Sequence, residues 1–241
     1  MKSRIYLLVN AGLLLAASPL HAVVGYVNVS FNPGYTLFEN PLQNTDNHLS
    51  AVMPTAPDGT VVSLWNSSAA TYGQSLTYDG LGHMWVDSNT LLPSDVLLNP
   101  GTGARWYNPG NTLFTGTFTG NVLNHDGTPF DGSNFSNPPP FSGPNGRYLL
   151  GDKAPVAATG DDIFLHILGR NPNVGEQYVT LSDTYAYEGS GTWLKDGSSI
   201  AAPSYAPGDA AFFDVVVPEP SLSALGLIGL AVLRRHLRCK V

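Results

Sequence analysis

The sequence predicts an all-β, mainly antiparallel fold, and two observations carry this prediction. First, glycine (26 residues) and proline (19 residues) are frequent among the 241 residues, while only 12% are charged. This composition favours short strands and turns over long helices. Second, short runs alternate between apolar and polar residues, which is the two-residue period of a strand with one buried face. Asn-Pro-Gly and Asp-Gly steps, which are turn signals, separate these runs.

The alternating runs predict the positions of the main elements. Strands are expected at residues 25–31, 60–65, 112–119, 163–168, 183–187 and 210–217. One short helix is expected at residues 47–53, because Asp46 stands where a helix cap is expected and Pro54 would end the helix.

A weak internal repeat predicts how these strands are grouped. Four segments match in the same order: GYTLFENPL (34–42) with GRYLLGDKAP (146–155), DGTVVSLW (58–65) with TGDDIFLH (159–166), GHMWVD (82–87) with GTWLKD (191–196), and LLPSDVLL (91–98) with YAPGDAAFF (205–213). Their common order predicts two tandem, weakly similar β units, 23–120 and 146–217, joined by an irregular linker, 121–145. Trp85 and Trp193 are then expected to be equivalent and largely buried.

The N-terminal 22 residues have the features of a secretory signal peptide. Lys2 and Arg4 form a short basic region, a mostly apolar run follows, and Ala22 ends a segment suitable for cleavage. We therefore expect the chain to be exported and cleaved after Ala22. The single cysteine, Cys239, lies near the other end, so the exported body contains no disulfide.

The C-terminal segment has the features of a membrane anchor. Residues 221–233 carry no charge, and Arg234, Arg235 and Arg238 follow them directly. A helix of this length spans about 20 Å at about 1.5 Å per residue, which is shorter than a bilayer core of about 30 Å. On length alone a buried core helix is the alternative. However, the arginines can extend the usable span and favour a cytoplasmic end, so the sequence predicts a transmembrane helix at 221–233.

The order of three features in this tail resembles a known sorting signal. Pro218, Glu219 and Pro220 come first, the short apolar helix follows, and the arginine cluster ends the chain. This arrangement, over residues 218–241, resembles the PEP-CTERM sorting domain of Gram-negative bacteria. The resemblance implies processing by an exosortase-type membrane enzyme. It also implies a tether to the inner membrane before processing, and then a place at the cell surface or outside the cell, often among exopolysaccharide.

The charge of the body excludes one class of partner. Residues 23–220 hold 5 of the 11 basic residues and all 18 acidic residues, which gives a formal net charge of −13. Such a body repels phosphate backbones, so we expect no nucleic-acid partner.

No sequence motif for catalysis, metal binding or cofactor binding is found. His48, His83, His125 and His166 are widely spaced and form no metal-ligand pattern, so no metal or cofactor is predicted. A pair of carboxylates for glycoside hydrolysis stays open as an alternative, because spacing in the sequence does not report separation in space.

One tripeptide is the best candidate for a ligand-binding surface. Arg105, Trp106 and Tyr107 lie between two Asn-Pro-Gly turns and have no evident counterpart in the second half. Exposed aromatic residues bind partners and sugars, although a buried core strand is the alternative. The sequence therefore predicts a secreted, surface-associated structural or interaction protein that is not an enzyme. The alternatives are a carbohydrate-binding module in the exopolysaccharide layer and a secreted glycan hydrolase.

Overall fold

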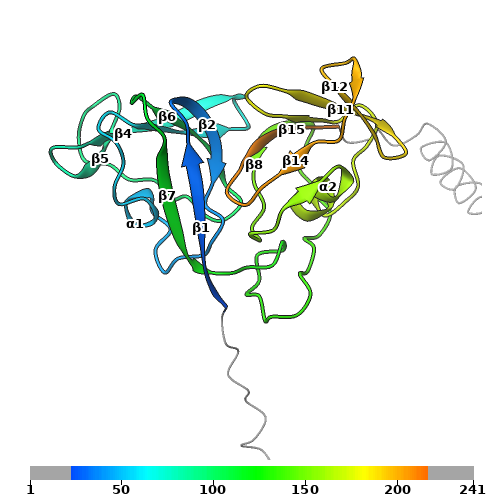
Figure 1. Cartoon of the computed structure of the whole chain (residues 1–241), viewed down its shortest axis with the longest axis horizontal. Helices are drawn as coiled ribbons and strands as arrows, with labels where there is room; N and C mark the ends of the chain where they lie inside the picture. Colours follow the sequence, from blue (N-terminus) through cyan, green and yellow to red (C-terminus); the bar gives the residue numbers. More distant parts are fainter. Residues whose placement is uncertain (1–22, 217–241) are drawn as a thin grey trace, which may run out of the picture.

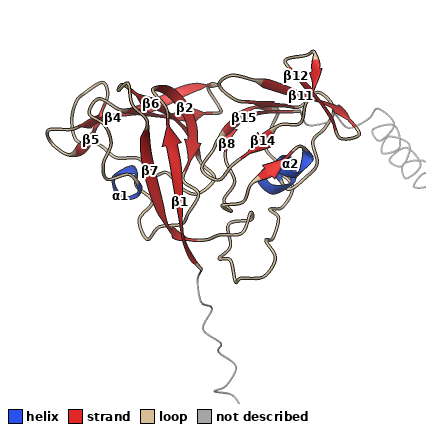
Figure 2. Cartoon of the chain, viewed as in Figure 1, coloured by secondary structure: helices blue, strands red, loops and turns tan. Residues whose placement is uncertain are grey.

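The computed structural model of the chain describes residues 23–216, which form fifteen strands and two helices (Figure 1). The pairings between named strands are all antiparallel, and helices are a minor part of the fold (Figure 2). The prediction of an all-β, mainly antiparallel body is confirmed. The predicted signal peptide, with Ala22, and the predicted tail, with Pro218, Glu219, Pro220, Arg234, Arg235 and Arg238, lie outside the described residues.

The first sheet has five strands in the order β2-β6-β3-β4-β5. These strands are β2 (Gly34–Glu39), β6 (Gly103–Asn108), β3 (Val61–Asn66), β4 (Thr71–Asp79) and β5 (Met84–Asp87). Paired residues form a row across this sheet, in the order Thr36, Trp106, Val62, Leu76 and Asp87.

The second sheet has six strands in the order β8-β15-β10-β11-β12-β13. These strands are β8 (Gly146–Leu150), β15 (Ala211–Val215), β10 (Gln177–Val179), β11 (Thr184–Gly189), β12 (Thr192–Lys195) and β13 (Ser199–Ile200). A corresponding row crosses this sheet, in the order Tyr148, Phe213, Tyr178, Tyr185 and Lys195.

The two sheets agree in strand order and in register. When the strands are counted in chain order, the first strand of each sheet pairs with the last, and the last pairs with the second. The second then pairs with the third, and the third with the fourth. When the first residues of β2 and β8 are matched, the two rows match residue by residue, and Trp85 then matches Trp193. Trp85 pairs with Tyr78 at a ring-centroid distance of 5.2 Å, and Trp193 pairs with Tyr187 at 5.1 Å. Both tryptophans are buried, as expected.

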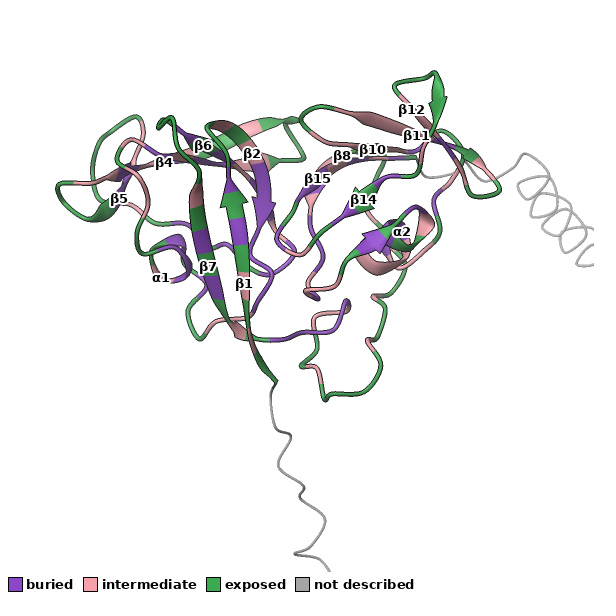
Figure 3. Cartoon of the chain, in the orientation of Figure 1, coloured by how far each residue is buried: buried purple, intermediate pink, exposed green. Residues whose placement is uncertain are grey.

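Each sheet carries a helix between its first and second strands. These helices are α1 (Leu49–Val52) and α2 (Asp161–Leu168), and both lie below their sheets in the view of Figure 1. The same side of the first sheet is covered by the paired strands β1 (Val24–Phe31) and β7 (Phe114–Asn121). Beside the second sheet the short pair β9 (Ala158–Thr159) and β14 (Ser204–Tyr205) accompanies α2. The buried residues therefore gather between each sheet and its cover (Figure 3).

The structure corrects the prediction of a strand at residues 163–168, which form most of helix α2. A short apolar run does not distinguish strand from helix by itself. Asp161 and Asp162 stabilise the positive N-terminal end of the helix, and Gly169 ends it in the left-handed conformation, with φ of 67°. The other helix, α1, is shorter than expected, and the carboxylate of Asp46 accepts a hydrogen bond from the His48 N–H without capping it.

The correction also changes two of the four repeat matches. Because 159–166 is mainly helical, the counterpart of β3 is β10. The segment around Leu97 forms an antiparallel bridge with His48 just before α1, and β14 pairs with β9 just before α2. Residues 96–98 therefore correspond to residues 203–205. Strand β15, which the sequence match pairs with 91–98, corresponds instead to β6.

The two sheets contact each other through reciprocal backbone bonds. Phe38, in β2, forms a bridge with Asp209, just before β15, and Leu150, in β8, forms the equivalent bridge with Thr102, just before β6. The N–H of Glu39 donates to the carbonyl of Gly208 at 3.0 Å, and that of Gly151 donates to the carbonyl of Gly101 at 3.1 Å. Such reciprocity is the property of a two-fold interface, here formed within one chain.

Candidate functional site

The predicted tripeptide at 105–107 is divided between two faces of strand β6. Successive side chains of a strand point to opposite faces. Trp106 is fully buried and stacks on Phe31 at 4.2 Å and on Phe114 at 5.6 Å between ring centroids. The prediction that Trp106 contributes to a binding surface is therefore wrong, and the alternative of a core strand holds for this residue.

Arg105 and Tyr107 lie on the opposite face, together with Tyr35 of the neighbouring strand. The rings of Tyr35 and Tyr107 are 5.0 Å apart, and the two residues are 55% and 36% exposed. The guanidinium of Arg105 lies 4.7 Å from the Tyr35 ring and 3.7 Å from the Tyr72 ring. Cation–π contacts of this kind hold the arginine against the aromatic residues. We call Tyr35, Arg105 and Tyr107 the tyrosine–arginine face.

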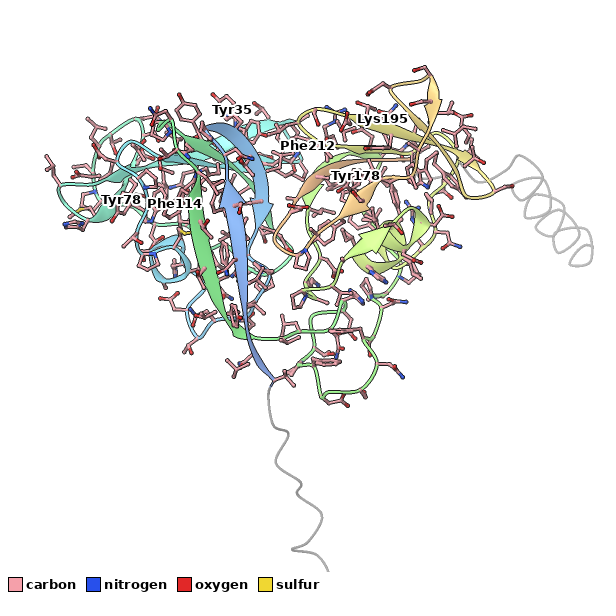
Figure 4. The ribbon with its side chains drawn as sticks, in the orientation of Figure 1. Tyr35, Tyr78, Phe114, Tyr178, Lys195 and Phe212 are labelled. Atoms are coloured by element: carbon pink, nitrogen blue, oxygen red, sulfur yellow. The ribbon has the colours of Figure 1, made fainter. Side chains whose placement is uncertain are left out.

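Aromatic contacts continue from this face onto the second sheet. Trp65 contacts Tyr72 and also Phe212, at 5.2 and 4.9 Å between ring centroids. Tyr35 and Phe212 both lie along the upper side of the view in Figure 4. The residues equivalent by register to Tyr35 and Tyr107 are Arg147 and Asp214, which form an ion pair of 2.6 Å. At this pair of equivalent positions the first sheet therefore carries two aromatic rings and the second an ion pair.

A second cluster lies on the covered side of the second unit and combines His125, Asp152 and His166. His125 follows β7 in the segment predicted as a linker, Asp152 follows β8, and His166 lies on α2. The sequence predicted no metal-ligand pattern for these histidines, because only the fold brings the three residues together. The one local signal, Asp161 and Asp162 before an apolar run, could have placed His166 on a helix.

The three side chains of this histidine–aspartate cluster are in direct contact. The Nδ1 atom of His125 lies 2.8 Å from each carboxylate oxygen of Asp152. The Nδ1 atom of His166 lies 3.8 Å from Oδ2 of Asp152, and this nitrogen is buried without a hydrogen-bond partner. The two imidazole rings stack at 4.0 Å with an interplanar angle of 19°. His125 and Asp152 are almost fully buried, whereas the His166 side chain is 20% exposed.

A buried hydrogen-bond network fixes the carboxylate of this cluster. The N–H of Ala154 donates to Oδ1 of Asp152 at 3.0 Å, and the N–H of Asp152 donates to the Tyr205 hydroxyl at 2.7 Å. That hydroxyl donates in turn to Oε1 of Glu39 at 2.7 Å. Burial raises the pKa of Glu39 and of Tyr205 well above their usual values. Tyr205 and Glu39, which both favour their neutral forms, therefore hold the backbone of Asp152 in place through this network.

A small cavity lies in front of the cluster. Its volume is about 130 Å³, and its lining includes His125, His166 and Lys153. Burial, followed by the nearby His125, lowers the pKa of His166 and favours its neutral imidazole. A neutral imidazole with a free nitrogen can accept a hydrogen bond or bind a cation.

The equivalent position in the first unit is filled differently. By register Asp152 corresponds to Asn40, and both side chains accept a bond from the N–H two residues later, Asn40 at 3.2 Å and Asp152 at 3.0 Å. The amide of Asn40 also donates to the carbonyl of Leu98 at 2.9 Å and lies 3.4 Å from Oδ1 of Asn47. The first unit therefore has a satisfied amide where the second has a carboxylate and two histidines.

Three glutamates, Glu39, Glu176 and Glu188, could supply a carboxylate pair for glycoside hydrolysis, and none of them lines the cavity. Glu39 is fully buried beside Tyr205, and Glu176 is fully buried in an ion pair with Arg170 of 2.6 Å. In this conformation neither is accessible to a substrate, whereas Glu188 is exposed on β11.

Comparison with known proteins finds no match for this chain among protein families, curated proteins or solved structures. Within residues 23–216, no helix is long and apolar enough to cross a membrane. The predicted helix at 221–233 lies outside this range.

Proposed function

We propose that this chain is an exported, surface-associated interaction protein without catalytic activity, delivered by its C-terminal tail. The observation that carries the proposal is the order of three features in residues 218–241: Pro218 to Pro220, the uncharged run, and the arginine cluster. The last described strand, β15, ends at Val215, directly before this tail. Because proline does not continue a strand or a helix, we expect Pro218 and Pro220 to leave this segment accessible to a processing enzyme.

Mass spectrometry of the mature protein from the cell surface tests tail processing. The C-terminus is expected near Pro218 to Pro220, and no peptide should contain Arg234 or Cys239. An intact C-terminus at the cell surface would contradict the proposal.

A charge variant tests the membrane step separately. Replacement of Arg234, Arg235 and Arg238 by Ala should weaken retention of the tail, because the cytoplasmic positive charge is lost. Cell fractionation and accessibility labelling measure this effect. Cys239→Ala is the matched control, since it changes the same segment without changing its charge, and it should fractionate like the unchanged chain.

A second candidate function is carbohydrate binding in the exopolysaccharide layer. The tyrosine–arginine face favours it, since two exposed rings lie 5.0 Å apart and an arginine is held beside them. Aromatic rings with a polar edge provide contact area with little loss of conformational entropy on binding. Glycan-array binding of the full chain tests this function. Tyr35→Ala combined with Tyr107→Ala should abolish a signal that the control Tyr26→Ala, on an exposed residue of β1, leaves unchanged. Equal binding by both variants would exclude the face as the site.

We also infer that the two sheets are tandem, weakly similar β units derived from one ancestral unit. The common strand order, the matched rows of paired residues and the reciprocal bridges support this inference. The matched Tyr–Trp pairs at 5.2 and 5.1 Å support it further, because register and core packing agree at the same place. The two helices also occupy equivalent positions in the chain order.

A further inference from the structure

The histidine–aspartate cluster has the donor set of a transition-metal site. Two imidazole nitrogens and one carboxylate, without a thiolate, suit zinc and its neighbours in the first transition row. The three potential ligand atoms all lie within 4.8 Å of one another. We propose that His125, Asp152 and His166 bind one divalent transition-metal ion of the zinc class, through both Nδ1 atoms and the carboxylate.

The distances in the cluster fit this proposal with small adjustments. Zinc–nitrogen bonds of about 2.0–2.1 Å separate tetrahedral ligand atoms by about 3.3 Å. The Nδ1–Oδ2 distances from His125 and His166 to Asp152, 2.8 and 3.8 Å, lie on either side of this value. A metal lies in the plane of each imidazole that binds it, and the two rings are nearly parallel. One ring must therefore turn, and a turn of His166 would break no hydrogen bond at its Nδ1 atom.

The unpartnered nitrogen is the feature that points to a ligand. Buried polar atoms in folded proteins nearly always have a partner, and those without one call for a functional reason. An ion between the three side chains would use the lone pair of the His166 Nδ1 atom. The ion would also take the place of the proton between His125 and Asp152, which would move to the His125 Nε2 atom or to solvent.

The surroundings resemble those of a metal site with an open coordination position. The Asp152 carboxylate is oriented by the Ala154 N–H, and such outer contacts hold a ligand in position for its metal. Three protein ligands leave a fourth position open, as in metal sites that bind water or a substrate. Here that position would face the cavity of about 130 Å³, beside Lys153.

The metal site would also attach the segment 121–145 to the second sheet and its helix. His125 comes from this segment, whereas Asp152 and His166 belong to the second unit. A metal ion would join the segment to β8 and α2, because binding to the folded state alone stabilises that state.

Metal titration of the untagged full chain tests the proposal. After removal of metal with a chelator, isothermal titration calorimetry with ZnCl2 should show one equivalent bound, and MgCl2 should show none. Asp152→Asn and His166→Ala should each weaken zinc binding by more than about 100-fold, since loss of an outer contact alone already costs about 10- to 100-fold. Asp152→Asn is expected to fold, because Asn40 makes the same backbone contact in the first unit.

The matched control is the exposed pair of His48 and Asp46, whose Nδ1 and Oδ1 atoms lie 2.6 Å apart. It has the same residue types but no third ligand within reach among the described residues. His48→Ala should leave zinc affinity unchanged. A cobalt-substituted chain should show the visible absorption of four-coordinate cobalt, and His166→Ala should lose it. Absence of a stoichiometric zinc site, or equal affinity in Asp152→Asn and the unchanged chain, would overturn the proposal.

Discussion

The two sheets share strand order and register and differ in side chains at equivalent buried positions, such as Asn40 in the first and Asp152 in the second. In the first unit Asn40 bonds to the backbone of Leu98, and its amide is neutral and satisfied. In the second unit Asp152 stands at the equivalent place, and potential ligand atoms of His125 and His166 lie within 4.8 Å of its carboxylate. The backbone contact of the side chain is the same in both. Strand order and register are therefore common to both sheets, while the carboxylate with two histidines beside it occurs at this position in the second sheet alone.

The largest expected losses of stability come from replacing the two equivalent buried tryptophans, and they test whether the two sheets pack equivalently. Trp85→Ala and Trp193→Ala should each lower the free energy of unfolding by about 3–5 kcal/mol, because each removes a buried ring from the core of its unit. Trp65→Ala, at a partly buried position, should cost less. Urea denaturation of the full chain measures all three. A much larger loss at one buried tryptophan than at the other would break the equivalence.

A second prediction concerns the position where Glu39 and Gly151 face each other. By register these residues are equivalent, and a Cβ atom added at Gly151 would lie 2.4 Å from the Cγ atom of Glu39. Gly151→Ala should therefore destabilise the protein by about 1–3 kcal/mol through overpacking. In a Glu39→Ala background the same change should cost less, as a double-mutant cycle would reveal. If Gly151→Ala lowers the free energy of unfolding equally in both backgrounds, the Glu39 side chain is not the cause of the destabilisation.

Glu39, whose equivalent in the second sheet is a glycine, also predicts a pH dependence of stability. Burial raises the pKa of Glu39 well above its usual value of 4.5. Between the two values the folded protein keeps a proton that the unfolded chain has released. The free energy of unfolding should therefore fall as the pH rises above about 4.5, by up to about 1.4 kcal/mol per pH unit, until the folded pKa is passed. Glu39→Gln should remove this part of the fall, which denaturation at several pH values measures. An unchanged pH profile in Glu39→Gln would assign the dependence to other groups.

The smallest effects are expected on the outer face. Asp214→Ala and Tyr107→Ala remove equivalent partners, one from an ion pair and one from a pair of rings. Each should cost less than about 1 kcal/mol, because both pairs are partly exposed. Only the cost of Asp214→Ala should shrink in high salt, since salt screens charges and leaves ring contacts intact. If salt changes the cost of both substitutions equally, charge attraction does not distinguish the Arg147–Asp214 pair from the Tyr35–Tyr107 pair.

The sequence predicted the long, alternating strands well and the short elements poorly. The run GYVNVSF lies within β1, because its two-residue period has one buried face. Strand β10 has only three residues, too few to display a period. The run at 163–168 is apolar at most positions, so its helical face became evident only from the burial of Ile163, Phe164 and Leu168. Short segments carry too little pattern to decide between the two periods.

The candidate sites were harder to predict than the strands. Alternation along β6 already implies that Arg105 and Tyr107 share a face and that Trp106 points the other way. Which face is covered depends on β1 and β7, and this was not evident from the sequence. The histidine–aspartate cluster unites residues 125, 152 and 166 from a loop, the residues after a strand, and a helix. No fixed spacing marks such a site, because the fold and not the local chain sets the distances between its ligands.

The position of β15 has a mechanical consequence. This last strand lies in the interior of its sheet, between β8 and β10, and not at an edge. At its end the N–H of Val216 donates to Glu176 at 2.9 Å, and its carbonyl accepts from Asn173 at 3.0 Å. A pull on the chain from the C-terminal side would therefore load two rows of backbone hydrogen bonds in shear at the same time. Until the proposed tail is processed, traction on the membrane tether is therefore resisted by hydrogen bonds along both sides of β15, and the strand does not peel away one bond at a time.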